Sequence, residues 1–240
     1  MHERTRSGVE LGIEDGIAWI TLDDGKVNAL STALLRELGA ALDAAERDGA
    51  LVVLRGREGI FSAGFDLASF RRGAEAGVEM VRTGAQLVLR LLALPRPVLT
   101  VCTGHAYPMG AFLMLAADVR FGVAGAWRIG MNETAIGLTV PNFAVELARH
   151  RLTPPGFVRI QSAAMFGPEE ALRLGYLDRL LDPDRLADAV REEASRLRAL
   201  DGPSFAATKA RINERALQAV RAGLAGDLET ASPPGGAEAA

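Results

Sequence analysis

Short apolar runs alternate with amphipathic stretches over the first 150 residues, and this order constrains the fold more than any other feature of the chain. Two runs, 50–56 and 96–104, are almost wholly apolar, which is typical of strands buried on both faces of a parallel sheet. Each follows a stretch, 34–48 or 74–94, whose apolar residues recur at helical spacing. From 157 to about 223 the pattern is almost entirely helical. The sequence therefore predicts an α/β core followed by a helical C-terminal part.

Shorter patterns refine this outline. The stretch 8–24 alternates apolar and polar residues around Asp-Gly, which predicts a hairpin of two strands. We expect residues 1–155 to form the core, 156–228 a helical region, and 229–240, which is poor in large apolar residues, a disordered tail. Periodicity alone does not separate a spiral of β-β-α turns from a doubly wound sheet.

The composition excludes several classes of function. The net charge is −3 and aromatic residues make up 5% of the chain, so a basic surface and base-stacking platforms for nucleic acid are not expected. No uncharged apolar stretch reaches the ~18 residues that a membrane helix needs. The charged N-terminus lacks the apolar centre of a secretory signal. These features predict a cytoplasmic protein without nucleic-acid or membrane partners.

The single cysteine and the few histidines indicate no disulfide and no metal site. Cys102 lies in an apolar run, so we expect a buried side chain rather than a nucleophile, and one thiol cannot form an internal disulfide. His2, His105 and His150 are scattered along the chain without the spacing of metal ligands.

One carboxylate stands out in an otherwise uncharged segment. Glu133 lies within GMNETAIGL at 130–138, where it is either a structural hydrogen-bonding group or a proton-transfer group with a raised pKa. Two earlier loops of small residues, FSAGFDL at 61–67 and GHAYPMGAF at 104–112, each follow an apolar run. Each loop can present a backbone N–H to a substrate oxygen. Two such donors and one carboxylate suit proton transfer beside a stabilised enolate.

Five segments in this order carry a family resemblance. They are KVNAL at 26–30, FSAGFDL at 61–67, GHAYPMGAF at 104–112 with Asp118 eight residues beyond Gly110, NETAIG at 132–137, and GPEEALRLGYLD at 167–178. Over residues from about 8 to about 215 the chain resembles the crotonase superfamily of enoyl-CoA hydratases and isomerases. The resemblance implies a β-β-α spiral core, a helical C-terminal region used for trimerisation, and a homotrimer or hexamer. It also implies a fatty acyl-CoA substrate, with CoA as part of the substrate and no separate cofactor.

The same resemblance implies an oxyanion hole of two backbone N–H groups that hold the thioester oxygen. Carried over by position, the donors are Ala63 and Met109. The family often has three glycines where this chain has Pro108-Met109-Gly110. Proline lacks an N–H, but it precedes the donor, so we expect the hole to persist and the Met109 side chain to narrow the acyl pocket or flank the thioester. Taken singly, Gly64 and Gly110 could equally serve tight turns.

The number of carboxylates separates the candidate reactions. Hydratases of the family resemble one another in using two glutamates, the first of which matches Phe112 here and the second Glu133. A lone glutamate resembles the Δ3,Δ2-enoyl-CoA isomerases, in which one base removes the C2 proton and returns it to C4. We therefore favour an isomerase. An enoyl-CoA hydratase working through another group, such as His105 or Tyr107, and a catalytically silent acyl-CoA binder remain alternatives.

The remaining residues of the predicted site are assigned to substrate binding. They are Lys26, Ala29, Ser62, Gly64, Phe65, Asp66, Leu67, His105, Tyr107, Gly110, Phe112 and Lys209. Lys26 and Lys209 are candidates for the CoA phosphates, unless they are solvated surface charges.

Purely structural roles compete with three of these assignments. Asp66 is also placed to cap the helix that follows it, and His105 to be a buried, hydrogen-bonded histidine. Glu133 could instead cap a turn and pair with an arginine such as Arg128.

Overall fold

The chain begins with a hairpin that opens the larger of two main sheets. A computed structural model describes residues 3–4 and 8–230. Within these residues the sheet takes the order β1 (Glu3–Arg4), β2 (Val9–Glu14), β3 (Ile17–Leu22), β5 (Leu51–Arg55), β8 (Val98–Cys102), β10 (Val119–Val123) and β13 (Arg179–Leu181). The pair β2–β3 is antiparallel and turns at Asp15-Gly16, both with positive φ, which confirms the predicted hairpin. From β3 to β13 neighbouring strands are parallel.

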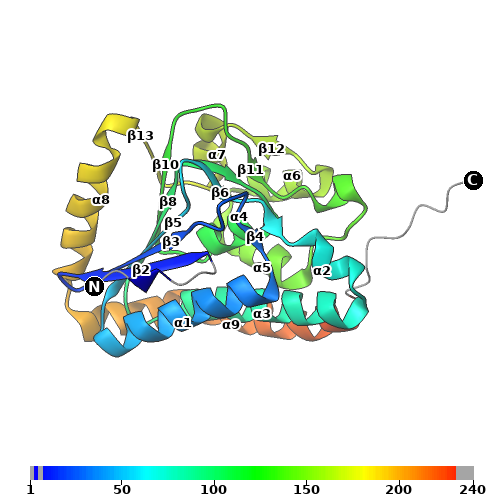
Figure 1. Cartoon of the computed structure of the whole chain (residues 1–240), viewed down its shortest axis with the longest axis horizontal. Helices are drawn as coiled ribbons and strands as arrows, with labels where there is room; N and C mark the ends of the chain where they lie inside the picture. The colour runs from blue at the N-terminus through cyan, green and yellow to red at the C-terminus, as the bar shows by residue number, and fades with distance from the viewer. Residues whose placement is uncertain (1–2, 5–7, 231–240) are drawn as a thin grey trace, which may run out of the picture.

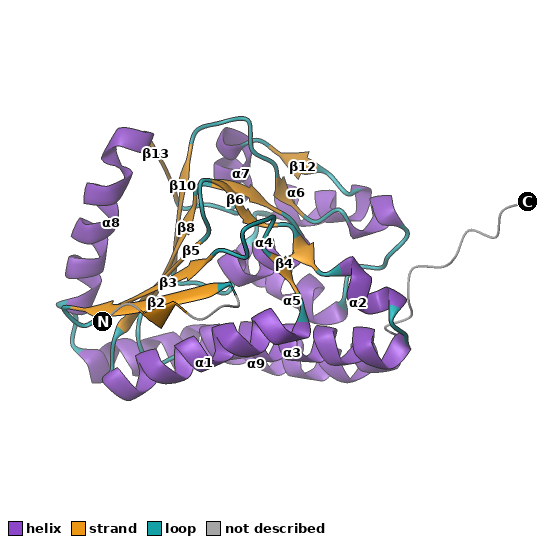
Figure 2. Ribbon diagram, viewed as in Figure 1, coloured by secondary structure: helices purple, strands orange, loops and turns teal. Residues whose placement is uncertain are grey.

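A second sheet lies across the carboxyl ends of these strands. Its order is β12 (Met165–Phe166), β11 (Ile129–Gly130), β9 (Gly104–Ala106) and β6 (Gly59–Ser62), and a separate pair joins β4 (Ala29–Leu30) to β7 (Gly64–Phe65). The pairs β5 and β6, β8 and β9, and β10 and β11 each add one strand to the larger sheet and one to the smaller, and helical turns follow each pair. This repeat is the β-β-α spiral that the resemblance implied, and Figure 2 shows both sheets in orange between the helices.

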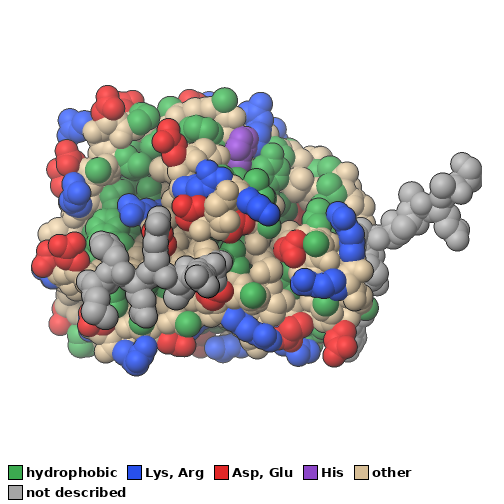
Figure 3. All heavy atoms as spheres, viewed as in Figure 1, with side chains coloured by type: hydrophobic (Ala, Val, Ile, Leu, Met, Phe, Trp, Pro, Cys, Tyr) green, Lys and Arg blue, Asp and Glu red, His purple; other side chains and the backbone are tan. Residues whose placement is uncertain are grey.

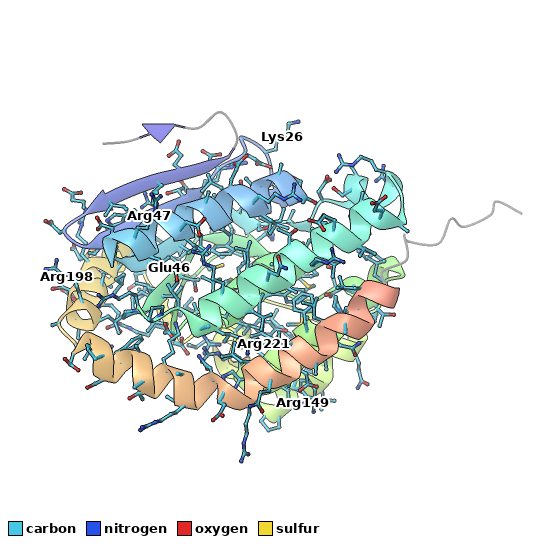
Figure 4. The ribbon with its side chains drawn as sticks, turned by 90° about the horizontal axis from the view of Figure 1, so that it is seen from below. Lys26, Glu46, Arg47, Arg149, Arg198 and Arg221 are labelled. Carbon is cyan, nitrogen blue, oxygen red and sulfur yellow. The ribbon has the colours of Figure 1, made fainter. Side chains whose placement is uncertain are left out.

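Helices cover both faces of the larger sheet. The elements α1 (Thr32–Asp48), α3 (Ala74–Ala93) and α9 (Gly202–Thr230) lie side by side on one face, seen from below in Figure 4. Arg90 of α3 joins two of them by ion pairs to Asp43 (2.7 Å) and Glu46 of α1. On the opposite face α8 (Pro183–Arg198) contacts β5 and β10, and it stands alone at the edge of Figure 1.

The remaining helices are shorter. They are α2 (Leu67–Arg71), α4 (Pro108–Leu115), α5 (Asn142–Arg151), α6 (Pro154–Arg159), α7 (Pro168–Leu174) and the 3₁₀ turns η1 (Glu133–Ile136) and η2 (Ile160–Ser162). The side chains of α4 from Met109 to Leu115 are wholly buried, so this helix forms the centre of the core. Cys102 is buried as expected, and burial raises the pKa of its thiol to about 12.

The C-terminal half differs from the sequence prediction in one respect. The strands β12 and β13 interrupt a region for which helices alone were expected. Both are only two or three residues long, and partners distant in sequence, β11 and β10, define them. Runs this short carry no readable period.

The structure describes only part of the predicted C-terminal tail. The predicted tail at 229–240 lies outside the described residues from 231 onward, and the boundaries at 155 and 228 remain predictions.

Throughout the described part of the chain, every helix is too short or too polar to cross a bilayer.

Candidate functional site

One cavity brings together residues from most turns of the spiral. It has a volume of about 560 Å³ and lies between the start of α4, η1, α2, α3 and the end of α9. Its walls consist of Ala63, Phe65, Leu67, Phe70, Val81, Tyr107, Pro108, Asn132, Glu133, the run from Ile136 to Asn142, and Asp227. Most of these side chains are apolar, and one end of the cavity carries a carboxylate. This combination suits a ligand with an apolar chain and a reactive group.

A larger cavity of about 1020 Å³ lies between the sheet and α8. Its carboxylates, Glu14 and Glu58, are exposed, and it contains no other acid. On the face shown in Figure 3, acidic and basic side chains are interspersed over the surface. A buried reactive group therefore distinguishes the smaller cavity.

Glu133 is the reactive group of the smaller cavity. It opens η1, whose turn ends at Gly137 with φ 75°, and only 5% of the residue is exposed. Neither carboxylate oxygen has a hydrogen-bond partner among the described residues. Burial raises the pKa of Glu133 to about 7. A carboxyl group that titrates near neutrality can both take and return a proton.

The competing structural role of Glu133 is absent from the described residues. Arg128 is exposed, its backbone N–H donates to Nδ1 of His105 (3.0 Å), and its guanidinium donates to the carbonyl of Trp127 (3.4 Å). No ion pair joins Arg128 to Glu133 in the part of the chain that the structure describes. The carboxylate is thus held by its backbone turn and left free at its oxygens.

The prediction of Ala63 as an oxyanion donor is wrong. Its backbone N–H donates to the carbonyl of Val27 at 2.9 Å and is therefore already used. In the parallel pair β4–β7, Leu30 is registered with Phe65, and the N–H of Asp66 donates to the carbonyl of Leu30 (3.2 Å). Because alternate residues of a strand face its partner, the N–H of Phe65 turns away from β4. Phe65 lines the cavity, so this N–H is the available donor.

The second predicted donor, Met109, lies where a free N–H is expected. It is the second residue of α4, which begins at Pro108, and the N–H groups of a helix's first turn have no acceptor within the helix. These N–H groups also form the positive end of the helix dipole. The Met109 side chain, however, is fully buried and absent from the cavity wall, so it does not narrow the pocket as predicted. Its sulfur lies instead against Gly84 of α3.

Two glycines permit the close approach of these donors. A Cβ on Gly64, whose φ is +89°, would lie 3.4 Å from Pro108 and 3.6 Å from the Met109 nitrogen. A Cβ on Gly110 would lie 2.8 Å from the Ser62 Cβ. The positive φ disfavours a side chain at Gly64, and the short distance to Ser62 excludes one at Gly110; the backbone of β7 thus lies against the start of α4.

Phe112 does not contribute to the cavity wall, contrary to its assignment to substrate binding. Its ring is fully buried and packs edge-on against Phe143, with ring centroids 5.5 Å apart. The residue at the position of the family's first glutamate is therefore part of the hydrophobic core. Among the described lining residues the carboxylates are Glu133 and Asp227.

Several other predicted residues support the loop rather than line the cavity. Asp66 caps α2 by accepting from the N–H of Ala68 (3.0 Å), as its structural alternative required. The Ser62 hydroxyl donates to the carbonyl of Asn28 (2.7 Å) and accepts from the N–H of Gly64 (3.1 Å). These bonds fix the chain on either side of Phe65.

The aromatic residues beside α4 divide in the same way. Leu67 and Tyr107 line the cavity as predicted, whereas His105 lies behind it. The ring of His105 stacks on Tyr107 with centroids 5.9 Å apart and is half-buried. Its imidazole has its own hydrogen bond from the Arg128 backbone, as the structural alternative predicted.

The two lysines and Ala29 lie outside the cavity. Lys26 projects from an exposed loop, as Figure 4 shows, and Ala29 lies in β4 beside Gly64. Lys209 is buried in α9 and pairs with Asp118 at 2.7 Å. Because the Lys209 ammonium is already paired with Asp118 inside the protein, it is not available to bind a CoA phosphate, contrary to its predicted role.

Two titratable groups at or near this site, Tyr176 and Asp227, were not predicted from the sequence. Tyr176 is fully buried, and its hydroxyl has no partner among the described residues. Burial, and then the charge of Glu133, raise the pKa of Tyr176, so the hydroxyl lies within electrostatic reach of the carboxylate. Asp227 lines the cavity from the far end of α9. The GYLD sequence could have indicated Tyr176, whereas no local pattern indicates Asp227.

Metal chemistry finds no support in the described residues. No group of three or more His, Cys, Asp and Glu side chains in 3–4 and 8–230 is arranged to hold a metal ion. The cavity wall as described is mostly apolar and carries two carboxylates, Glu133 and Asp227.

Known proteins share both the sequence and the arrangement. A sequence profile described as enoyl-CoA hydratase/isomerase matches residues 12–234. A Mycobacterium avium protein named probable enoyl-CoA hydratase is 36% identical over 205 residues, which span 82% of this chain and 78% of that protein.

Two solved structures have the same fold. An enoyl-CoA hydratase/isomerase family protein from Pseudomonas syringae superimposes with a TM-score of 0.90 at 39% identity, covering 92% of this chain and 97% of the other. A Mycobacterium tuberculosis protein described as an enoyl-CoA isomerase gives a TM-score of 0.89 at 39% identity, covering 94% of this chain and 100% of the other. These likenesses confirm the crotonase fold.

Proposed function

The chain belongs to the enoyl-CoA hydratase/isomerase family and is an enzyme of that family, and on this premise we propose that it moves the double bond of a 3-enoyl-CoA to position 2. The substrate is a fatty acyl-CoA thioester, whose acyl chain lies along the apolar wall of the cavity. CoA enters as part of the substrate, so the reaction needs no separate cofactor.

The reaction uses the groups that meet at the end of the cavity. The thioester oxygen accepts hydrogen bonds from the N–H groups of Phe65 and Met109. Glu133 removes a proton from C2, and the electron pair is delocalised onto that oxygen as a dienolate. The protonated Glu133 then returns the proton to C4, the double bond forms between C2 and C3, and the thioester carbonyl is restored. Proton and electrons balance without a further reactant.

The observation that carries this proposal is the isolation of Glu133. Its carboxylate is buried, unpartnered among the described residues and titrates near 7, while the other expected acid is replaced by the buried ring of Phe112. One carboxylate is sufficient to shuttle a proton between two carbons. Activating and splitting a water across the double bond requires a base and an acid.

An enoyl-CoA hydratase is the second candidate, favoured by the name of the Mycobacterium avium relative. In that case a group other than residue 112 would supply the acid, and Tyr107 carries the phenolic hydroxyl of the described cavity wall. The M. tuberculosis relative is described as an isomerase in one solved structure and as a probable enoyl-CoA hydratase in another, so names alone do not decide between the two.

A paired assay on one preparation decides between them. Trans-3-hexenoyl-CoA is followed for conversion to the 2-enoyl isomer, and crotonyl-CoA for hydration. Isomerisation many times faster than hydration, and lost in Glu133→Gln, supports the proposal. Dominant hydration that is lost in Tyr107→Phe supports the hydratase. Acyl-CoA binding without either activity in the wild-type enzyme would indicate a silent binder.

The assembly and location of the enzyme are proposals of the same kind. A homotrimer or a hexamer is expected, and light scattering of the purified protein measures which one forms. We also propose a cytoplasmic location, which fractionation of the source cell tests.

A further inference from the structure

Asp227 caps a helix that belongs to another part of the chain. The helix α5 begins after Pro141, and no local side chain caps its first N–H groups. The two carboxylate oxygens of Asp227 accept from the N–H of Asn142 (2.6 Å) and of Phe143 (2.9 Å). Asp227 is 5% exposed, and it reaches these groups from the last turns of α9. A carboxylate at a helix N-terminus is favoured by both hydrogen bonding and the helix dipole.

The capped helix start is also part of the cavity. Asp227, Asn142 and Pro141 line the same cavity as Glu133. Between η1 and α5 the chain from 138 to 141 has no regular structure, yet it forms the apolar wall with Leu138 and Val140. This segment is fixed at one end by the bond from the N–H of Leu138 to the carbonyl of Glu133 (2.9 Å). At its other end, Asp227 fixes it through the start of α5.

We infer that Asp227 is a positioning residue that sets the selectivity of the enzyme for acyl-chain length, by holding the 138–142 wall against the distal part of the chain. This inference rests on the proposed acyl-CoA function of the cavity. A short acyl group stays near Glu133 and the oxyanion donors. A longer chain reaches the end of the wall near α5, and only its binding depends on how firmly Asp227 holds that end.

The test measures binding rather than turnover, so it does not depend on which reaction is catalysed. Isothermal titration gives the Kd of two saturated thioesters, hexanoyl-CoA and dodecanoyl-CoA, for the full-length protein. The variants are Asp227→Ala and Asp227→Asn, the second being nearly isosteric and retaining one acceptor oxygen. Ser31→Ala is the matched control, because it also removes a helix cap, from Leu34 of α1, at a helix that does not line the cavity.

The expected result is a change in the ratio of the two Kd values. In Asp227→Ala the Kd for dodecanoyl-CoA rises about tenfold, because the free energy lost with a helix cap is close to that of a tenfold change in Kd. The Kd for hexanoyl-CoA changes less than about twofold, and Asp227→Asn gives an intermediate ratio. Ser31→Ala leaves the ratio at the wild-type value.

Two results overturn the inference, and they are distinguishable. If the folded Asp227→Asn and Asp227→Ala proteins bind both thioesters with the wild-type ratio, Asp227 does not set chain-length selectivity, although the cavity still binds acyl-CoA. If the wild-type protein binds neither thioester, the proposed function fails and this inference fails with it.

Discussion

Two carboxylates of this protein, the largely buried Asp118 and the buried Glu133, differ in their partners. Asp118 accepts from the backbone N–H of Val98 (2.8 Å) and from the ammonium of Lys209 (2.7 Å) at the junction of α9 with the core. Glu133 accepts from no partner among the described residues and lies in a cavity wall. Residue type does not separate the two acids, but their surroundings do, because Asp118 lies beside the cation of Lys209. The difference in their partners separates a group that holds the fold from one that is available for chemistry.

The environment of Lys209 shows how pairing affects the pKa of a buried group. Burial lowers its pKa, and the neighbouring Asp118 opposes that shift. An ion pair of this kind is costly to break on one side, because the remaining charge is left buried. Glu133 has no ion-pair partner among the described residues, and burial, opposed only by its own backbone N–H, raises its pKa to about 7. The following changes test this comparison.

The largest effect is expected for Glu133→Gln. Removing the proton acceptor lowers the rate of isomerisation by about 10²- to 10⁴-fold, which is the usual contribution of a general acid–base group. Steady-state kinetics with trans-3-hexenoyl-CoA measures the loss, and titration with saturated hexanoyl-CoA is the control for intact binding. Unchanged turnover in the Gln variant would exclude Glu133 as the proton shuttle.

Breaking the ion pair should affect stability instead. Lys209→Met leaves the Asp118 carboxylate buried without its cation, and we expect a loss of about 3–5 kcal/mol in the free energy of unfolding. Urea denaturation measures this loss, and the double variant with Asp118→Asn should recover much of it. The pH profile of the residual folded enzyme should match the wild type. A shifted profile would mean that Lys209 acts on the reacting groups.

The stability of Glu133→Gln should depend on pH differently from that of the wild type. The folded-state pKa of Glu133 is raised from 4.5 to about 7, so the folded protein binds this proton more tightly than the unfolded chain. The wild type therefore loses stability as pH rises from 4.5 through 7, by about 3 kcal/mol from this group. The variant lacks this loss. Its melting temperature relative to wild type should increase from pH 5 to pH 8, and a constant difference would contradict the raised pKa.

The smallest effect is expected for Tyr176→Phe. The buried hydroxyl is a dipole within electrostatic reach of Glu133, and replacing it with hydrogen makes the surroundings of the carboxylate more apolar. The wild-type rate should rise with pH through about 7 as Glu133 loses its proton. In the variant we expect the midpoint of this rise in rate to move to a pH higher by about half a unit. Tyr107→Phe, in the cavity wall, offers a comparison. An unchanged pH–rate profile in Tyr176→Phe would exclude the influence of its hydroxyl.

Local patterns predicted much of the fold, because they report local interactions. The Asp15-Gly16 turn and the apolar runs of β5 and β8 lie where the sequence indicated. The family and the crotonase fold are confirmed by the matching relatives. The strands β12 and β13 were missed, since pairing with distant strands defines them.

The site was predicted less completely, for reasons that individual residues show. Ala63 and Phe65 lie two positions apart in one loop, and both could have supplied the donor. The register with β4 and the bond to Val27 decide which N–H is free. The sequence allowed Lys209 to bind a phosphate, but in the folded chain its ammonium pairs with Asp118, 91 positions away. No sequence pattern links such distant partners.

The sequence by itself determined the family, the order of the secondary structure and the isolation of Glu133 as an acid among uncharged residues. These properties follow from residue type and spacing along the chain, which set local backbone preference and the cost of burying a charge. Only the tertiary structure decided which backbone N–H groups are free, which lysine is paired and that Asp227 closes the cavity wall. Those properties depend on hydrogen bonds and ion pairs between segments up to 91 residues apart, and such bonds exist only once the chain has folded.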